Sequence, residues 1–172
     1  MSENRESGPA TMTNPTTVER RSGRELVITR RFNAPARIVF AAWTTPALFM
    51  RWWAPKSAGM SLLSCEMDVR VGGGYRIAFG RDPANAMPFF GTYLDVTPHS
   101  RLAWTNEESA DGAVTTVTFA ESDGKTLLTF HERYPTKEAL DASIEGMEGG
   151  MPEQFGQLDE LLATLSAGEA RP

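Results

Sequence analysis

Hydrophobic and polar positions alternate along most of the middle of the chain, which predicts a run of β-strands. In six segments apolar residues recur at every second position, as expected for strands with one buried face. Turn-forming residues separate the segments, and connections this short require neighbouring strands to be antiparallel. The predicted strands cover residues 60–69, 74–80, 89–97, 101–106, 114–121 and 125–133.

The segment before these strands predicts one further strand and two short helices. Apolar residues alternate with polar ones in residues 25–32, which indicates a half-buried strand. Pro35 and Pro46 then favour two helix starts, because proline is well tolerated in the first turn of a helix. Each helix would present an apolar side to the core.

The C-terminal part of the chain has a helical pattern. Between residues 140 and 165 apolar residues follow one another at steps of three and four, which is typical of an amphipathic helix. Its middle is interrupted by Gly146, Gly149, Gly150 and Pro152, and both residue types weaken a helix. We therefore expect a short helix, a kink or loop, and a long helix from about residue 152 to residue 165.

This order of elements predicts a single α+β domain over residues 24–166. About seven antiparallel strands can cover one long C-terminal helix only if the sheet curves around it, and we expect bending at Gly72–Gly74 and Gly91. Residues 1–23 are polar and predict a disordered leader, and residues 167–172 predict a loose tail.

Charge and cysteine content narrow the class of protein. The net charge of −5 argues against a nucleic-acid-binding surface, which needs a surplus of Lys and Arg. Cys65 is the only cysteine, so an intramolecular disulfide is excluded and a cytoplasmic location is expected. We expect Cys65 to be a buried small side chain. No segment has the roughly 20 consecutive apolar residues of a membrane span, and no secretory signal is visible, so we expect no membrane partner.

Aromatic and methionine residues are the main candidates for a site. Facing one interior space, they would form either a solid core or the wall of an apolar cavity. Glu132 shares a strand face with Leu128 and Phe130, which places it at the inner rim and His131 outside. The candidate ligand-binding residues are Trp52, Trp53, Tyr75, Phe79, Tyr93, Trp104, Glu132, Met147, Met151 and Phe155.

Motifs for metal, cofactor or catalysis are incomplete. His131-Glu132 begins a zinc-protease pattern, but Pro135 stands where the second histidine is needed. Gly72–Gly74 precedes a strand instead of opening a helix, unlike a dinucleotide-binding loop. We therefore predict no metal and no cofactor, and we assign no catalytic residue.

A set of short motifs in a fixed order resembles the activator of heat-shock-chaperone ATPase homologue family. They are Phe32-Asn-Ala-Pro35, Val39 to Pro46, Trp52-Trp53-Ala-Pro55, Asp68 to Gly73, Gly91 to Pro98, Thr126 to Phe130, Glu145 to Glu148 and Leu158 to Leu161. The resemblance implies the helix-grip fold of the START/SRPBCC superfamily, whose members include small-molecule carriers, cyclases and chaperone activators. Many relatives have a Trp where this chain has Met151, so we expect its cavity to be lined differently.

Three functions are compatible with these observations. The first is a binding protein for an apolar or aromatic small molecule, which we favour. The second is a cyclase or hydrolase that uses Glu132 or a tyrosine as acid or base. The third is an interaction with a chaperone, which is less expected because no separate N-terminal domain of the activator type is visible. Leu127, on the outer sheet face, also suggests a homodimer.

Overall fold

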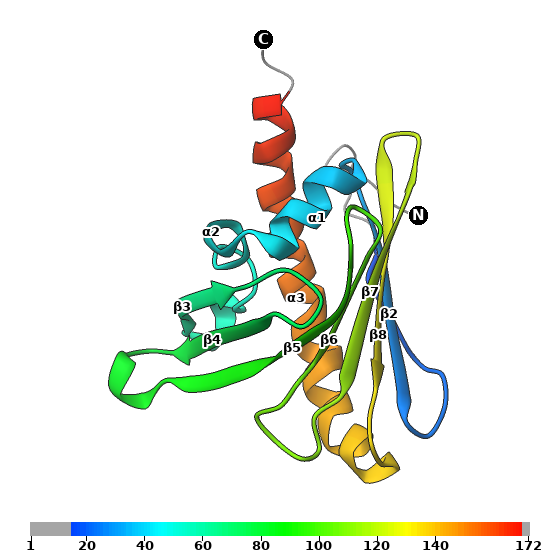
Figure 1. Ribbon diagram of the computed structural model, residues 1–172. Helices are drawn as coiled ribbons and strands as arrows, with labels where there is room; N and C mark the ends of the chain where they lie inside the picture. The colour runs from blue at the N-terminus through cyan, green and yellow to red at the C-terminus, as the bar shows by residue number, and fades with distance from the viewer. Residues whose placement is uncertain (1–14, 170–172) are drawn as a thin grey trace, which may run out of the picture.

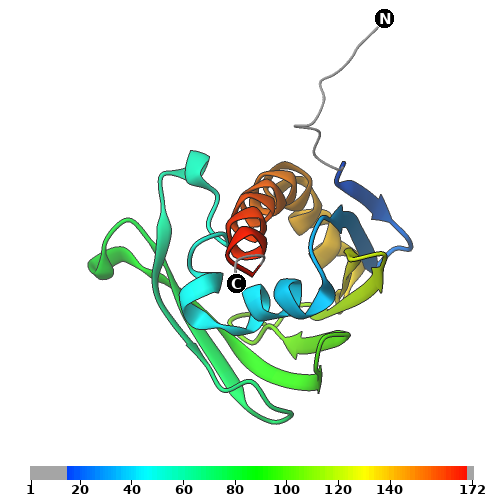
Figure 2. The same ribbon diagram turned by 90° about the horizontal axis from the view of Figure 1, so that it is seen from above.

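An eight-stranded antiparallel sheet curves around one long helix in the computed structural model, which describes residues 15–169 (Figures 1 and 2). The order of strands across the sheet is β1-β2-β8-β7-β6-β5-β4-β3. The predicted α+β helix-grip fold is confirmed, with one strand more than expected. The strands are β1 (Thr17–Arg20), β2 (Glu25–Phe32), β3 (Ser61–Met67), β4 (Gly74–Gly80), β5 (Met87–Thr97), β6 (Arg101–Thr105), β7 (Val114–Ser122) and β8 (Lys125–Arg133).

Short helices close one end of the space between the sheet and the long helix. Both helices predicted after the first long strand are present, and Pro46 lies at the start of the second as expected. Seen from above, they cross the opening of the curved sheet (Figure 2). The helical segments before the long helix are α1 (Ala36–Thr44), α2 (Pro46–Phe49), η1 (Lys56–Ala58) and η2 (Pro83–Asn85).

The long helix α3 (Lys137–Glu169) is continuous, so the predicted break near Pro152 is wrong. Pro152 lies on the exposed side, while Met151 and Phe155 beside it are buried in the core. Burial of this apolar face outweighs the local weakening by proline and glycine. The helix also extends past residue 166 to Glu169; the remainder of the predicted loose tail lies outside the described residues.

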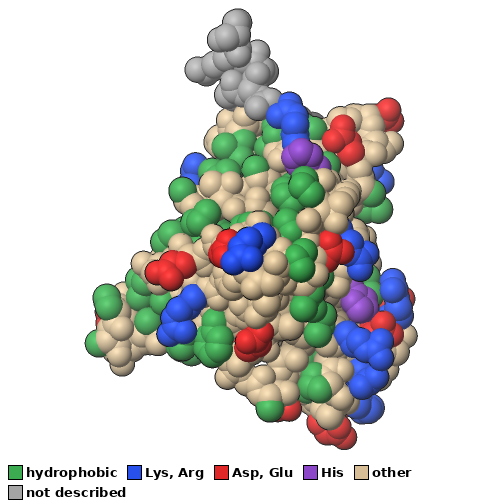
Figure 3. Space-filling view, in the orientation of Figure 1, with side chains coloured by type: hydrophobic (Ala, Val, Ile, Leu, Met, Phe, Trp, Pro, Cys, Tyr) green, Lys and Arg blue, Asp and Glu red, His purple; other side chains and the backbone are tan. Residues whose placement is uncertain are grey.

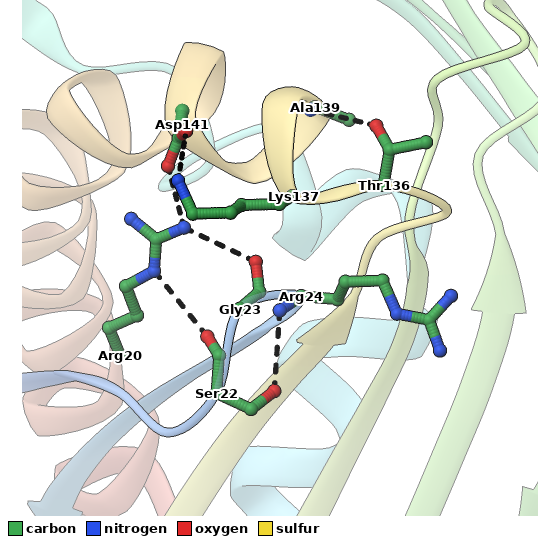
Figure 4. A network of polar contacts seen from close by, with 8 residues as sticks. All are labelled: Arg20, Ser22, Gly23, Arg24, Thr136, Lys137, Ala139 and Asp141. Carbon is green, nitrogen blue, oxygen red and sulfur yellow. Dashed lines mark hydrogen bonds and ion pairs between the residues drawn. The ribbon is translucent and has the colours of Figure 1, made fainter.

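Residues 17–20, which we expected to belong to a disordered leader, form the edge strand β1 instead. An ion pair between Arg20 and Asp141 holds its end against the start of α3, and hydrogen bonds order the turn that follows β1 (Figure 4). The Arg20 guanidinium lies 2.6 Å from a carboxylate oxygen of Asp141 and donates to the Gly23 carbonyl at 3.2 Å. A polar segment is ordered here because its backbone pairs with β2 and its charge is paired with α3. Residues 1–14 of the predicted leader lie outside the described part of the chain.

The two faces of β8 point in the predicted directions. Phe130 and Glu132 are buried on the inner face. His131 lies on the outer face, with its Nε2 2.9 Å from a carboxylate oxygen of Glu25. Leu127 also faces outward and is 36% exposed. The homodimer suggested by Leu127 stays a prediction.

Gly91 lies at a close approach between two parts of the sheet. Strand β5 pairs with β4 through residues 87–92 and with β6 through residues 93–97. A Cβ atom on Gly91 would lie 1.9 Å from the carbonyl oxygen of Thr105, far inside van der Waals contact. Only glycine therefore permits this approach of the two backbones.

The surface has no single chemical character on the face shown in Figure 1. Acidic, basic and apolar side chains are interspersed there (Figure 3).

Among residues 15–169, no helix combines the length and the apolar character that a membrane crossing requires.

Candidate functional site

A cavity of about 470 Å³, open to solvent on one side, lies between the inner face of the sheet, the short helices and α3. Its wall is mostly aromatic and aliphatic. Strands β4 and β5 contribute Ile77 and Phe89, helices α1 and α2 contribute Trp43 and Phe49, and α3 contributes Met147. The cavity exists because a curved sheet meets the helix along one side and leaves space at the other.

Eight of the ten candidate residues from the sequence line this cavity. They are Trp53, Tyr75, Phe79, Tyr93, Trp104, Glu132, Met147 and Met151. The structure does not bring Trp52 and Phe155 to it. Trp52 is 0% exposed and donates its indole N–H to the Ala42 carbonyl at 2.9 Å. Phe155 packs edge-on against Phe32, so both side chains belong to the solid core.

Several lining residues were missed by the sequence interpretation. Alternation along β8 could have found Phe130, which shares its face with Glu132. The segment after β6 has no periodic pattern, so nothing in the sequence indicated that it reaches the cavity. The missed residues include Trp43, Phe49, Met67, Ile77, Phe89, Asn106, Glu108, Asp111, Phe130, Tyr134, Ser143 and Gln154.

Two glutamines of α3 hold the segment that carries Trp53. The Gln157 side chain donates to the carbonyls of Trp52 and Ala54, both at 2.9 Å. The Gln154 side chain donates to the Trp53 carbonyl at 2.5 Å. The carbonyl groups of this irregular segment are therefore hydrogen-bonded to side chains of α3. These bonds fix the part of the cavity wall that Trp53 forms.

Glu132 is the principal polar group of the cavity, and two hydroxyl groups bind it. It is only 9% exposed. Thr115, its direct neighbour on β7, donates to one carboxyl oxygen at 2.8 Å. Tyr134, just after β8, donates to the other oxygen at 2.5 Å. The pairing of β7 with β8 thus places Thr115, and the path of the chain after β8 places Tyr134.

A chain of hydrogen bonds continues from Glu132 toward the end of β6. The amide nitrogen of Asn106 donates to Thr115 Oγ1 at 2.9 Å and to the Ala113 carbonyl at 2.6 Å. The Tyr75 hydroxyl lies 2.7 Å from the Thr105 carbonyl and 3.2 Å from Asn106 Oδ1. Because Asn106 supplies a donor to Thr115, the threonine hydroxyl is free to donate to Glu132.

Burial alters the acid–base behaviour of this network. Loss of solvent raises the pKa of the Glu132 carboxyl, and hydrogen bonds from Tyr134 and Thr115 oppose this shift in part. Burial also raises the pKa of the Tyr75, Tyr93 and Tyr134 hydroxyls. These three tyrosines therefore stay protonated at neutral pH, and the hydroxyls of Tyr75 and Tyr134 act as hydrogen-bond donors.

We expect the substitution Glu132→Gln to become relatively more favourable as pH rises. A carboxyl with a raised pKa in the folded state contributes stability that is complete below its unfolded pKa and is lost as pH rises through the folded pKa. Glutamine does not titrate, so the difference in unfolding free energy between the variant and the original protein should move in the variant's favour as pH rises from acidic to neutral. Urea denaturation at several pH values measures this. The same change at Glu160, exposed on α3, serves as control, and a pH-independent difference would contradict the prediction.

Cys65 is only half-buried, not fully buried as we expected, and it packs against the core. Partial burial raises the pKa of its thiol to about 11, so the thiol is protonated at neutral pH. In the described part of the chain, no group of three or more His, Cys, Asp or Glu side chains is placed to hold a metal ion.

Comparison with known proteins agrees with this fold. The family model described as Activator of Hsp90 ATPase homolog 1-like protein matches residues 33–163. A solved structure from Rhodobacter sphaeroides is similar with a TM-score of 0.80 and 26% identity, over 88% of this chain and 99% of that one. A structure from Nitrosomonas europaea has a TM-score of 0.75 and 25% identity, over 83% of this chain and 96% of that one. No curated protein matches the chain.

Proposed function

This chain belongs to the Activator of Hsp90 ATPase homolog 1-like family, and we propose that it binds an apolar or aromatic small molecule in its internal cavity. The observation that carries the proposal is the cavity itself. Its volume of about 470 Å³ falls within the range of roughly 300–1,000 Å³ that is usual for small-molecule sites. Its wall is largely apolar and carries a few convergent polar groups around Glu132, which is the usual chemistry of such sites.

Trp43, which lines the cavity, carries an unsatisfied donor that faces the core. Trp43 is almost fully buried, and its indole N–H has no hydrogen-bond acceptor within residues 15–169. A buried donor without an acceptor lowers stability by about 1–3 kcal/mol. This N–H is shielded from the cavity, so only the ring of Trp43 forms part of the cavity wall.

Thermal-shift measurements against a library of apolar and aromatic metabolites test the proposal. A ligand present at a hundred times its dissociation constant adds about 2.7 kcal/mol to the unfolding free energy. For a domain of this size the melting temperature should rise by roughly 5–10 °C. A library that gives no shift would count against the proposal.

Filling part of the cavity should reduce the shift produced by any ligand found in this way. In Met147→Trp the larger side chain of a half-buried lining residue would occupy part of the space. Met87→Trp is the matched control, because Met87 is 46% exposed and lies outside the cavity wall. Equal ligand shifts in the two variants would contradict binding in the cavity.

Glu132 also supports a second candidate function, acid–base catalysis on a bound molecule. A buried carboxyl with a raised pKa and a tyrosine hydroxyl at 2.5 Å resembles the arrangement of catalytic acids. If the Glu132→Gln variant still turns over a bound ligand at the original rate, this candidate function is ruled out.

We also propose a cytoplasmic location for the protein, because it has a single cysteine.

A further inference from the structure

We propose that the cavity selects amines, with the apolar body of the ligand among the aromatic side chains and its ammonium group at Glu132. This inference rests on the proposed function and adds the charge of the ligand to it. Three features of the wall carry it: the sign of its charges, the partners of Glu132, and the aromatic surfaces beside that carboxyl.

Among residues 15–169, every charged side chain on the cavity wall is acidic. Glu132 lies inside, while Glu108 and Asp111 are exposed on the segment between β6 and β7 that borders the cavity. In the part of the chain that the structure describes, the lining residues include no Lys, Arg or His. Charges of one sign around an apolar cleft attract ligands of the opposite sign and repel those of the same sign. A fatty acid or another anion is therefore disfavoured here.

Glu132 has no cationic partner among the described ion pairs, although buried carboxylates are usually paired. Its two partners are the hydroxyls of Thr115 and Tyr134, one on each oxygen. A carboxylate can accept about four hydrogen bonds, so acceptor capacity remains for the N–H groups of an ammonium. An ammonium group would supply the positive charge and the N–H donors that complement this carboxyl.

Aromatic side chains lie at the same end of the cavity. The Tyr75 ring centroid is 5.8 Å from that of Tyr93 and 6.4 Å from that of Trp104. The Tyr75 hydroxyl is also part of the hydrogen-bond chain through Asn106 that ends on Glu132. Aromatic faces attract an ammonium group within about 6 Å, and Tyr and Trp do so strongly.

Burial means that the charge state of Glu132 responds to what is bound beside it. It raises the pKa of the Glu132 carboxyl, the hydrogen bonds from Tyr134 and Thr115 oppose this shift, and nearby Glu108 adds to it. A bound ammonium group would favour the ionised form and so gain a charge-assisted contact with this buried carboxyl. An alcohol of the same shape would gain only an ordinary hydrogen bond.

Three probes that share one apolar body test the selection: 4-phenylbutylamine, 4-phenylbutanol and 4-phenylbutyrate. Titration calorimetry at neutral pH with the full chain measures each dissociation constant. We expect the amine to bind at least tenfold more tightly than the alcohol, and the carboxylate to bind most weakly. Equal affinity of amine and alcohol would overturn charge selection while leaving the proposed apolar site intact. If none of the three binds, the proposed site fails for ligands of this size and the inference falls with it.

Substitutions then test which residues are responsible for the preference for the amine. Glu132→Gln should reduce the preference for amine over alcohol by about tenfold, and Glu160→Gln, which removes the same charge at a distant exposed position, should leave it unchanged. If Glu132→Gln does not fold, Glu108→Gln combined with Asp111→Asn at the exposed border should still lower the preference by several-fold. An unchanged preference in the folded variants would overturn the assignment of these carboxylates.

Discussion

Replacing Trp52 with alanine is expected to lower the free energy of unfolding by about 3–5 kcal/mol, the usual range for a buried Trp or Phe. Trp52 has no exposed surface, and its ring centroid lies 4.8 Å from that of Trp43 and 5.3 Å from that of Phe49. The substitution would also leave the Ala42 carbonyl without its buried donor. Urea denaturation followed by circular dichroism measures the change.

The neighbouring tryptophan provides the comparison. Trp53 is half-buried and lines the cavity, so its removal enlarges an existing space instead of creating a new one in the core. Trp53→Ala should therefore reduce stability less than Trp52→Ala, by a margin of at least about 1 kcal/mol. It should also weaken the binding of any ligand found in the cavity. Equal losses of stability would contradict the division between core and cavity wall.

Replacing Gly91 with alanine is expected to destabilise the protein by about 3 kcal/mol, at the upper end of the range for overpacking. The added Cβ would meet the Thr105 carbonyl oxygen at 1.9 Å and the Tyr75 ring at 2.9 Å. The backbone cannot yield here without disturbing the pairing of β5 with its neighbours. The Tyr75 ring borders the cavity, so ligand affinity should fall as well.

A glycine-to-alanine substitution in α3 should have the opposite effect on the free energy of unfolding. Gly146 lies within the helix on its exposed side, and a Cβ there would meet nothing within 4 Å. Because alanine is the better helix former, Gly146→Ala should raise the unfolding free energy by about 0.5–1 kcal/mol. Denaturation curves of both variants under one condition test the pair. A loss of stability at position 146, or no loss at position 91, would contradict the packing described.

The cavity has a simple structural origin. Strands β3 to β5 form one part of the curved sheet and β6, β7, β8 and β2 continue it, while α3 crosses the concave side (Figures 1 and 2). Toward α1 the concave space is filled by the aromatic cluster around Trp43 and Trp52. Farther from that cluster lies Glu132, which within residues 15–169 has the hydroxyls of Thr115 and Tyr134 as partners and forms no ion pair.

The amino-acid sequence by itself determined the order of the elements and the two faces of most strands. These features depend on residues close in the chain: alternation with period two, turn residues, and apolar steps of three and four. For this reason the inward position of Glu132 and the outward position of His131 follow from the alternation along β8 alone. The missed strand β1 shows the limit, because its order depends on contacts with β2 and α3.

Only the tertiary structure decided which aromatic residues border open space and which fill the core. Trp52 and Trp53 are adjacent and chemically identical, yet one lies in the core and the other on the cavity wall, because their surroundings come from α1 and α3. The continuity of α3 through Pro152 likewise depends on burial against the sheet, which outweighs local propensity. The partners of Glu132 come from β7 and from the segment after β8, so its setting follows from strand register and packing, which no local pattern encodes.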